Sequence, residues 1–381
     1  MAREESNSVF KRRSGRFLRR IGARTHRARG FASAMSILIT GGLGFLGLQT
    51  ASALLRRGVV WSPLFKQPVS IKKITLFDIP AAISAGAASV PKELREDPRV
   101  AIKTGDLGED GIAAELIDDD DLSIVHLASM VSGDTEANPD RGWRVNVEGQ
   151  RALLEAVKAS APGARFLFTS STATLGPVPE GRIADDSTKL LPGNTYGFHK
   201  AVCELMINDY ARRGWVDARG LRLPVIVVRP GAPNAALTGA WSTVVRDPLK
   251  GLDVTIPIPL EARLPVASYQ TVVGSVAAML NEVDGRALGA DRTLMLPSLS
   301  LSVAEMHAAA KSFAARHGLP IGTVTSRAQE VATRIVGGMG SRADGARAVS
   351  AGLPCDESAE SIVAAYAADY VLPKLPTSST S

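Results

Sequence analysis

Residues 36–47 of this chain read Ser-Ile-Leu-Ile-Thr-Gly-Gly-Leu-Gly-Phe-Leu-Gly. The first five form a short β-prone run, and residues 48–57 after the glycines have the apolar spacing of a helix. A strand, a glycine turn and a helix in this order favour a dinucleotide-binding unit over the alternative, a surface turn. We therefore expect an α/β protein whose parallel sheet begins here.

Each glycine of this turn has a physical task in such a unit. Gly41 permits the tight turn, and Gly44 lets a pyrophosphate approach the positive end of the helix. Gly47 allows the helix to pack closely on the strand. Phe45 and Leu46, which lie between the last two glycines, are expected to contact the same cofactor.

A second strand is predicted over residues 73–77, and it ends at Asp78. An acid in this position accepts both hydroxyl hydrogen bonds of the adenosine ribose and repels a 2′-phosphate, which favours NAD over NADP. Asp78 follows the glycines at more than the usual ~20 residues, which we attribute to an inserted loop over residues 60–70. A turn aspartate that only ends the strand is the alternative.

Two more predicted strands, residues 100–104 and 124–128, extend the cofactor site. The second is almost continuously apolar, as buried parallel strands are. After the first, an acid is placed to meet the adenine amino group, and the next residue lends its backbone. The expected cofactor contacts on these two segments are Asp106, Leu107, Leu127 and Ala128.

The predicted fifth strand, residues 165–169, is followed by a serine doublet and then by a helix that opens on Tyr196 and Lys200. Tyr and Lys four residues apart lie on one helix face. A neighbouring ammonium favours the phenolate and lowers the pKa of a phenol from its usual value near ~10, so Tyr196 could act as a base. Ser171 would then hold the reacting oxygen of the substrate. Asn146, on a long helix predicted from about residue 140, is assigned to water-mediated support of the cofactor.

The sixth predicted strand covers residues 221–229 and contains Pro224, which cannot donate a hydrogen bond to a neighbouring strand. We therefore expect the backbone to be interrupted there. Leu223 and Pro224 are predicted to line a nicotinamide pocket at this interruption.

Composition excludes several classes of protein. The 381 residues are 45% hydrophobic and 22% charged, which is typical of a globular chain. No apolar run approaches the roughly 20 residues of a membrane helix. Cys203 and Cys355 match no metal or redox spacing.

The net charge of +6 is concentrated in residues 1–34, which carry ten Lys and Arg residues against two acids. The remainder is slightly acidic and has no basic stripe of the kind that binds nucleic acid. An Arg-rich, acid-poor start indicates a mitochondrial transit peptide, a disordered basic arm, or a true start at Met35. We favour a cytoplasmic enzyme, with a mitochondrial location as the alternative.

These residues resemble the extended short-chain dehydrogenase/reductases, also called the NAD-dependent epimerase/dehydratase family, over about residues 36–372. The motifs that carry the resemblance are Thr40 to Gly47, Val125 to Ser129, Asn146, Ser171, Tyr196 and Lys200. More specific stretches resemble a branch of that family that oxidises small sugar acids such as D-erythronate. They are residues 131–136, 208–214, 221–224, 228–234 and 244–249.

The resemblance implies that NAD oxidises the C2 hydroxyl of a four-carbon sugar acid to the 2-oxo acid. A buried carboxylate needs a matching charge or convergent donors, so we expect it at Arg246 or at the backbone of Ser132 and Gly133. An arginine that pairs with Asp247 is the alternative for Arg246. Asn234 is a further expected substrate contact. The chain departs from the family pattern at Ala232, where a lysine is usual, and over residues 237–241.

We therefore expect a Rossmann-type doubly wound parallel sheet with a smaller C-terminal substrate-binding lobe. The expected division is a basic extension over 1–34, an NAD-binding domain over 35–235 and an interleaved lobe over 236–375. The chemistry needs no metal, since a phenolate and an oxidised nicotinamide suffice. Small sugar acids are the expected partners, without nucleic acid or membrane, and a homodimer is compatible with the sequence.

Two other functions fit part of the pattern. A nucleotide-sugar epimerase or dehydratase uses the same Tyr, Lys, Ser and NAD, but it needs a deep basic and aromatic pocket, and the C-terminal lobe offers few aromatic residues. A non-catalytic NAD sensor is disfavoured, because it has no need of a phenol with a tuned pKa.

The first prediction concerns the cofactor. We expect Asp78 to face the 2′ position with no adjacent arginine to accept a phosphate, so NAD should be preferred to NADP. The measurement is the ratio of kcat/KM for the two cofactors. Equal values, or a preference for NADP, would mean that Asp78 only ends its strand.

Overall fold

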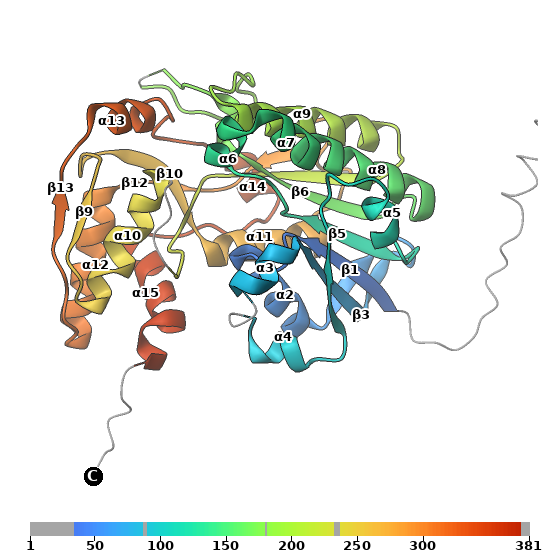
Figure 1. Ribbon diagram of the computed structural model, residues 1–381, viewed down its shortest axis with the longest axis horizontal. Coiled ribbons are helices and arrows are strands. Elements are labelled where there is room, and N and C mark those ends of the chain that lie inside the picture. Colours follow the sequence, from blue (N-terminus) through green and yellow to red (C-terminus); the bar gives the residue numbers. More distant parts are fainter. Residues whose placement is uncertain (1–33, 87–89, 180, 232–236, 375–381) are drawn as a thin grey trace, which may run out of the picture. The chain divides into compact units, whose positions relative to one another are not determined.

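The computed structural model describes residues 34–86, 90–179, 181–231 and 237–374 (Figure 1). Of the predicted N-terminal extension, only Ala34 lies inside these ranges, as the first residue of β1. None of the helices in the described ranges is long and apolar enough to cross a membrane.

Eight strands of the described residues form one sheet in the order β11-β7-β6-β5-β1-β3-β2, with β4 also paired to β3. All pairs are parallel except β2 with β3. Their bounds are β1 Ala34–Thr40, β2 Val59–Ser62, β3 Gln67–Asp78, β4 Val100–Thr104, β5 Leu122–His126, β6 Arg165–Ser171, β7 Asp217–Leu223 and β11 Thr293–Met295.

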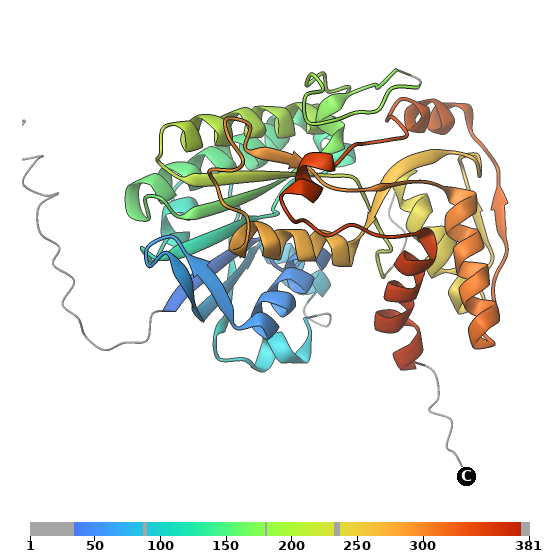
Figure 2. The ribbon, with the colours of Figure 1, turned by 180° about the vertical axis from the view of Figure 1, so that it is seen from behind.

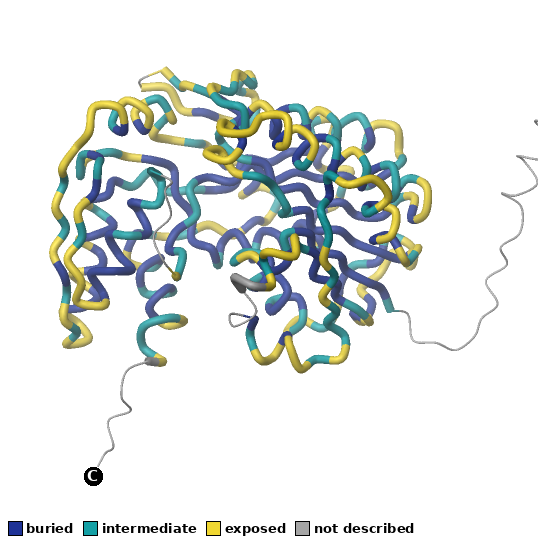
Figure 3. Tube along the Cα trace, in the orientation of Figure 1, coloured by how far each residue is buried: buried dark blue, intermediate teal, exposed yellow. Residues whose placement is uncertain are grey.

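Helices cover both faces of this sheet, so the predicted doubly wound architecture is confirmed. One face packs against α2 (Phe45–Arg57) and α11 (Tyr269–Asn281), which Figure 2 shows side by side. The other face packs against α8 (Gly149–Ser160) and α9 (Thr195–Arg212). Because both faces are covered, the central strands are buried along almost their whole length (Figure 3).

Most predicted elements lie where the sequence places them, with small shifts at their ends. The helix expected from residue 140 is three consecutive segments: α7 (Pro139–Trp143), a π-helical turn (Arg144–Glu148) and α8. The segment that follows β5 includes a short helix, α6 (Ser132–Ala137).

The prediction of an inserted loop over residues 60–70 is wrong. Strand β2 and the first part of β3 form an antiparallel hairpin there, with Val59 opposite Ser70 and Ser62 opposite Gln67. Val60 and Val69 are both buried, so the hairpin adds apolar residues to the core. An alternation this short, interrupted by two prolines, gives little periodic signal.

The predicted interruption of the sixth strand is confirmed. Strand β7 ends at Leu223, and after the buried Pro224 the chain forms β8 (Val225–Val227) in a different sheet. There β8 pairs with β10 (Arg263–Ser268), which also pairs with β12 (Leu299–Ser302).

The C-terminal elements surround a second core. It contains α10 (Ala240–Arg246), α12 (Val303–His317), α13 (Glu330–Gly337) and α15 (Ala359–Tyr370), together with β9 (Val254–Ile256), which pairs with β13 (Val324–Ser326). Since α11 and β11 return to the first sheet, the chain passes between the two cores more than once. The domain bounds stated above stay a prediction.

Candidate active site

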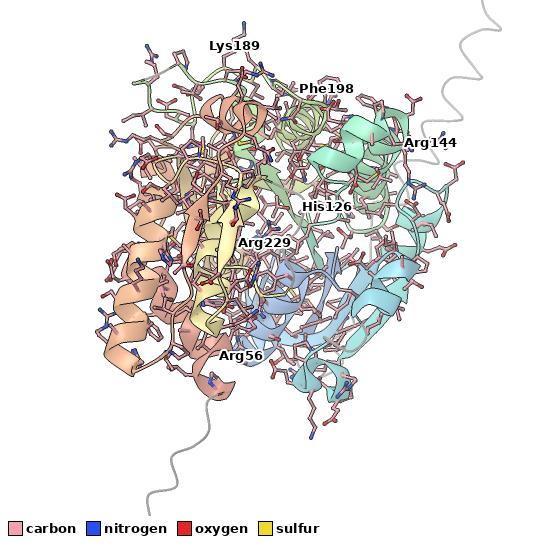
Figure 4. The ribbon with its side chains drawn as sticks, turned by 60° about the vertical axis from the view of Figure 1, so that its left-hand side comes forward. Arg56, His126, Arg144, Lys189, Phe198 and Arg229 are labelled. Carbon is pink, nitrogen blue, oxygen red and sulfur yellow. The ribbon has the colours of Figure 1, made fainter. Side chains whose placement is uncertain are left out.

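The register of the sheet aligns the strand ends that carry the predicted site. Thr40 lies opposite His126, and His126 lies opposite Phe168. The residues that follow each strand therefore meet at one carboxyl edge, where α/β sheets bind ligands. The Thr40 hydroxyl lies 2.7 Å from His126 Nδ1, and His126 is fully buried within the sheet (Figure 4). Burial, together with the charge of Lys200, lowers the pKa of His126 to about 3, so the imidazole is neutral.

The glycine turn leaves no room for side chains. Gly41 has φ +69°, and a Cβ added there would lie 2.8 Å from the backbone nitrogen of Ala128. A Cβ at Gly47 would lie 2.3 Å from the carbonyl oxygen of Gly41. Gly44 begins α2 without a side-chain cap, and no acid stands in the first turn of that helix. The positive helix end is therefore available to a pyrophosphate, and the turn fits a dinucleotide.

Two acids stand at the carboxyl ends of neighbouring strands, as predicted: Asp78 is the last residue of β3, and Asp106 comes shortly after β4. The Asp78 carboxylate accepts a hydrogen bond of 3.0 Å from the backbone of Leu43, so it lies beside the glycine turn. The Asp106 carboxylate accepts bonds of 2.8 Å from both Gly108 and Arg141. Leu107 next to it is buried in the core. Their roles toward NAD stay predictions.

Asn146 holds the segment that follows β5. Its side-chain oxygen accepts a bond of 2.8 Å from the Met130 backbone, and its amide donates one of 3.0 Å to the Met130 carbonyl. Asn146 lies in the π-helical turn, and its own carbonyl accepts a bond from the Cys203 thiol. The structure thus gives Asn146 a positioning task, and its predicted water bridge to the cofactor stays a prediction.

The three predicted catalytic residues converge from β6 and α9. Ser171, the last residue of β6, accepts a bond of 3.1 Å from the Ala173 backbone, which leaves its hydroxyl hydrogen to donate elsewhere. Lys200 Nζ donates a bond of 2.8 Å to the Thr169 carbonyl on the same strand. It also lies 5.6 Å from the centre of the Tyr196 ring. Tyr196 stands in the first turn of α9, which Asn194 caps through its side chain.

Burial dominates the protonation of these groups. It raises the pKa of Tyr196 to about 12, and a hydrogen bond with Ser171 opposes this rise. We expected Lys200 to lower the pKa of Tyr196, but no such effect is found. Burial also lowers the pKa of Lys200 to about 8, against the opposing effects of Cys203 and Glu204. The phenol is therefore protonated at neutral pH unless a further positive charge stands beside it.

A buried ion pair behind these residues was missed at the sequence level. Glu204 on α9 and Arg222 on β7 pair at 2.6 Å, and each side chain is 3% exposed. Ser170 on β6 donates a hydrogen bond to the same carboxylate. Glu204 follows Lys200 by four residues, so the helical spacing alone could have drawn attention to it. The pair fixes α9 against two strands.

The role of Glu136 in positioning α9 was also missed at the sequence level. Its carboxylate accepts a bond of 2.6 Å from the backbone of Thr195, at the start of α9. The acid comes from α6, which contains the predicted substrate contacts Ser132 and Gly133. Both of these residues are exposed. The start of the Tyr196 helix and the predicted substrate segment are therefore held together.

Arg246 does not lie as expected. It is 3% exposed, and its guanidinium donates two bonds of 2.9 Å to Asp247, one to each carboxylate oxygen. The alternative reading, an arginine paired with Asp247, describes it better, although it is buried rather than at the surface. Asn234 and Ala232 lie outside the described residues.

A cavity of about 730 Å³ lies at the opposite, amino edge of the sheet. It is lined by the first residues of β6 and β7, including Arg165, Asp217 and Arg219. These side chains bind one another and the carbonyl groups at the end of α11. This cavity is separate from the glycine turn and from Tyr196.

The fold and the carboxyl edge of the sheet, with its glycine turn, define a Rossmann-type enzyme that binds a dinucleotide. The model of the NAD dependent epimerase/dehydratase family matches residues 37–287. The chain belongs to this family, the predicted resemblance is confirmed, and the chain is an NAD-dependent oxidoreductase.

Two relatives are D-erythronate dehydrogenases. The one from Cupriavidus necator is 40% identical over 343 residues, which cover 89% of this chain and all of the relative. The one from Haemophilus influenzae is 37% identical over 273 residues, 71% of this chain and 80% of the relative. A solved structure described as a nucleoside-diphosphate-sugar epimerase from Agrobacterium tumefaciens is 32% identical, with a TM-score of 0.77. The match covers 91% of this chain and 98% of the chain in that structure.

The second prediction concerns the base. Tyr196→Phe keeps the ring and removes the titrating oxygen, so kcat should fall by at least about 100-fold while the affinity for NAD changes little. Lys200→Ala should damage both. The matched control is Tyr210→Phe on the same helix, α9, which removes a phenol that donates a hydrogen bond to Glu155 of α8. Steady-state kinetics and NAD titration provide the measurement. Residual activity of more than a few per cent in Tyr196→Phe would assign the base to another residue.

Proposed function

We propose that this chain is an NAD-dependent dehydrogenase that oxidises the C2 hydroxyl of a small sugar acid such as D-erythronate to the 2-oxo acid. The observation that carries the proposal is the 40% identity to a D-erythronate dehydrogenase along that protein's whole length. The convergence of Ser171, Tyr196 and Lys200 at the carboxyl edge supports the reaction type.

Oxidation of an alcohol removes a proton from the oxygen and a hydride from the carbon. NAD, when bound, accepts the hydride and places a positive ring near the reacting groups. In our proposal, the Tyr196 phenolate takes the hydroxyl proton, and the Ser171 hydroxyl donates a hydrogen bond to the substrate oxygen. Lys200 keeps its ammonium beside the phenol while Thr169 orients it. A phenol whose pKa burial raises to about 12 needs both positive charges to ionise near neutral pH.

A nucleotide-sugar epimerase is the second candidate, because a solved relative at 32% identity is described as one. A nucleotide base would need an exposed aromatic surface or a deep pocket. The large aromatic side chains of the described C-terminal core are occupied: Trp241 is fully buried and donates to the Leu301 carbonyl, and Phe313 is 3% exposed. This packing favours a small substrate.

Two expectations from the sequence accompany the proposal and stay predictions. They are a cytoplasmic location, with a mitochondrial one as the alternative, and a homodimer.

The third prediction identifies the substrate. The purified chain should reduce NAD with D-erythronate and not with erythritol, which has the same carbon chain but no carboxylate. The epimer at C2, D-threonate, should be a poor substrate, because its hydride points away from the cofactor face. A panel of free sugar acids and nucleotide sugars, followed by NADH absorbance, provides the measurement.

One outcome would reject the proposal in favour of the second candidate. It is the absence of NADH with every sugar acid, together with NAD that stays bound through purification and conversion of a nucleotide sugar.

A further inference from the structure

The proposed substrate is an anion, and the structure limits which cation can receive its carboxylate. Lys200 donates to Thr169 and serves the phenol. Arg246 is the cation that the sequence suggested, but Asp247 occupies it through both carboxylate oxygens. Asp247 also pairs with Lys250 at 3.6 Å. One carboxylate therefore already balances two cations in this cluster.

Arg229 is a third cation, and it is directly attached to the same cluster. Its backbone nitrogen donates a bond of 3.2 Å to the Ser242 hydroxyl, and its carbonyl accepts one of 3.3 Å from Arg246. The main chain of Arg229 is thus fixed at both ends by α10. A side chain that starts from a fixed backbone loses less conformational freedom when it binds a ligand.

The Arg229 guanidinium has no acidic partner within 4.0 Å and no hydrogen-bond acceptor among the residues that the structure describes. The side chain is nevertheless partly buried. Burial lowers the pKa of Arg229, and the charge of Arg246 lowers it further, with no carboxylate acting in the opposite direction. By contrast, the pKa of the buried Arg222 is raised by its partner Glu204 although burial itself lowers it. A partly desolvated, unbalanced guanidinium is unfavourable unless an anion joins it.

The position of Arg229 places it near the cofactor end of the site. It follows β8, where Val227 pairs with Ser268. The next residue, Tyr269, contacts Phe45 of α2 with ring centres 5.0 Å apart. Figure 4 shows Arg229 at the border between the yellow elements after β8 and the blue ribbon of α2. The segment of Arg229 thus lies on the side of the C-terminal elements that meets the glycine-turn helix.

We propose that Arg229 binds the carboxylate of the sugar acid and makes the site specific for acids. This inference rests on the proposed function, since it names how the substrate of that reaction is recognised. A planar guanidinium matches a carboxylate through two parallel N–H···O bonds. In a 2-hydroxy acid the carboxylate is attached to C2 itself, so fixing it also orients the C–H bond from which the hydride leaves.

The pyrophosphate of NAD is the other anion that could reach this region. It already has a partner in the uncapped start of α2 and the glycine turn. Lys200 and Arg246 already have partners, so of these three cations only Arg229 is left for the carboxylate of the substrate. The structure therefore favours the substrate over the cofactor as the ligand of Arg229.

The fourth prediction is a test of this assignment with Arg229→Gln and Arg229→Lys. Arg229→Gln should raise the KM for D-erythronate about 10- to 100-fold, because a charge-assisted pair is lost, and should leave the KM for NAD within about twofold. Arg229→Lys should recover part of the loss. Arg263→Gln, which removes an exposed arginine paired with Glu305, is the matched control. The methyl ester of D-erythronate should be used equally well by wild type and Arg229→Gln.

A binding measurement separates this inference from the proposed function. D-erythronate is titrated into wild type and Arg229→Gln, each saturated with NADH, and thermal unfolding checks that both are folded. Binding that depends on Arg229 without turnover would reject the function and keep the inference. Turnover with an unchanged KM for the acid in Arg229→Gln would reject the inference and keep the function. A rise in the KM for NAD alone would assign Arg229 to the pyrophosphate, and absence of binding to wild type would reject both.

Discussion

The parallel register of four central strands is the constraint on which the site depends. Thr40, His126, Phe168 and Gly220 stand side by side across β1, β5, β6 and β7. Beyond these residues the strands end at one edge of the sheet, where the glycine turn follows β1 and the serine doublet ends β6. Two hydrogen bonds involving His126 reinforce this row: one between its ring and the Thr40 hydroxyl, and one that the Thr169 hydroxyl donates to its carbonyl. A shift of one residue between two strands would turn the side chains to the opposite face.

The helix that carries Tyr196 is tied to this edge by charge as well as by packing. Glu204 and Arg222 form a buried pair, and Ser170 joins it. Such pairs add little net stability, but removal of one partner typically costs about 3–5 kcal/mol because the other charge is left buried. The pair therefore specifies where α9 sits more than it strengthens the fold. Because α9 is placed in this way, the Lys200 ammonium can donate a hydrogen bond to the Thr169 carbonyl on β6.

Features with a local signal could be predicted from the sequence, and those set by tertiary partners could not. The glycine turn, the helix of Tyr196 and Lys200 and the break at Pro224 follow from spacing within a few residues. The hairpin of β2 and β3 was missed because its two short segments pair only in space. Arg246 and Arg229 look alike in sequence, yet only the fold shows that Asp247 occupies the first. The high pKa of Tyr196 likewise comes from burial, which no spacing reveals.

The most direct measurement follows one hydrogen atom. D-erythronate that carries deuterium at C2 is incubated with NAD and the purified chain, and the released NADH and the remaining sugar acid are analysed by mass spectrometry. We predict that the deuterium appears in the nicotinamide ring of free NADH, because the hydride leaves C2 directly. Deuterium lost to water, or returned to the sugar acid without free NADH, would contradict an NAD-dependent dehydrogenase that acts at C2.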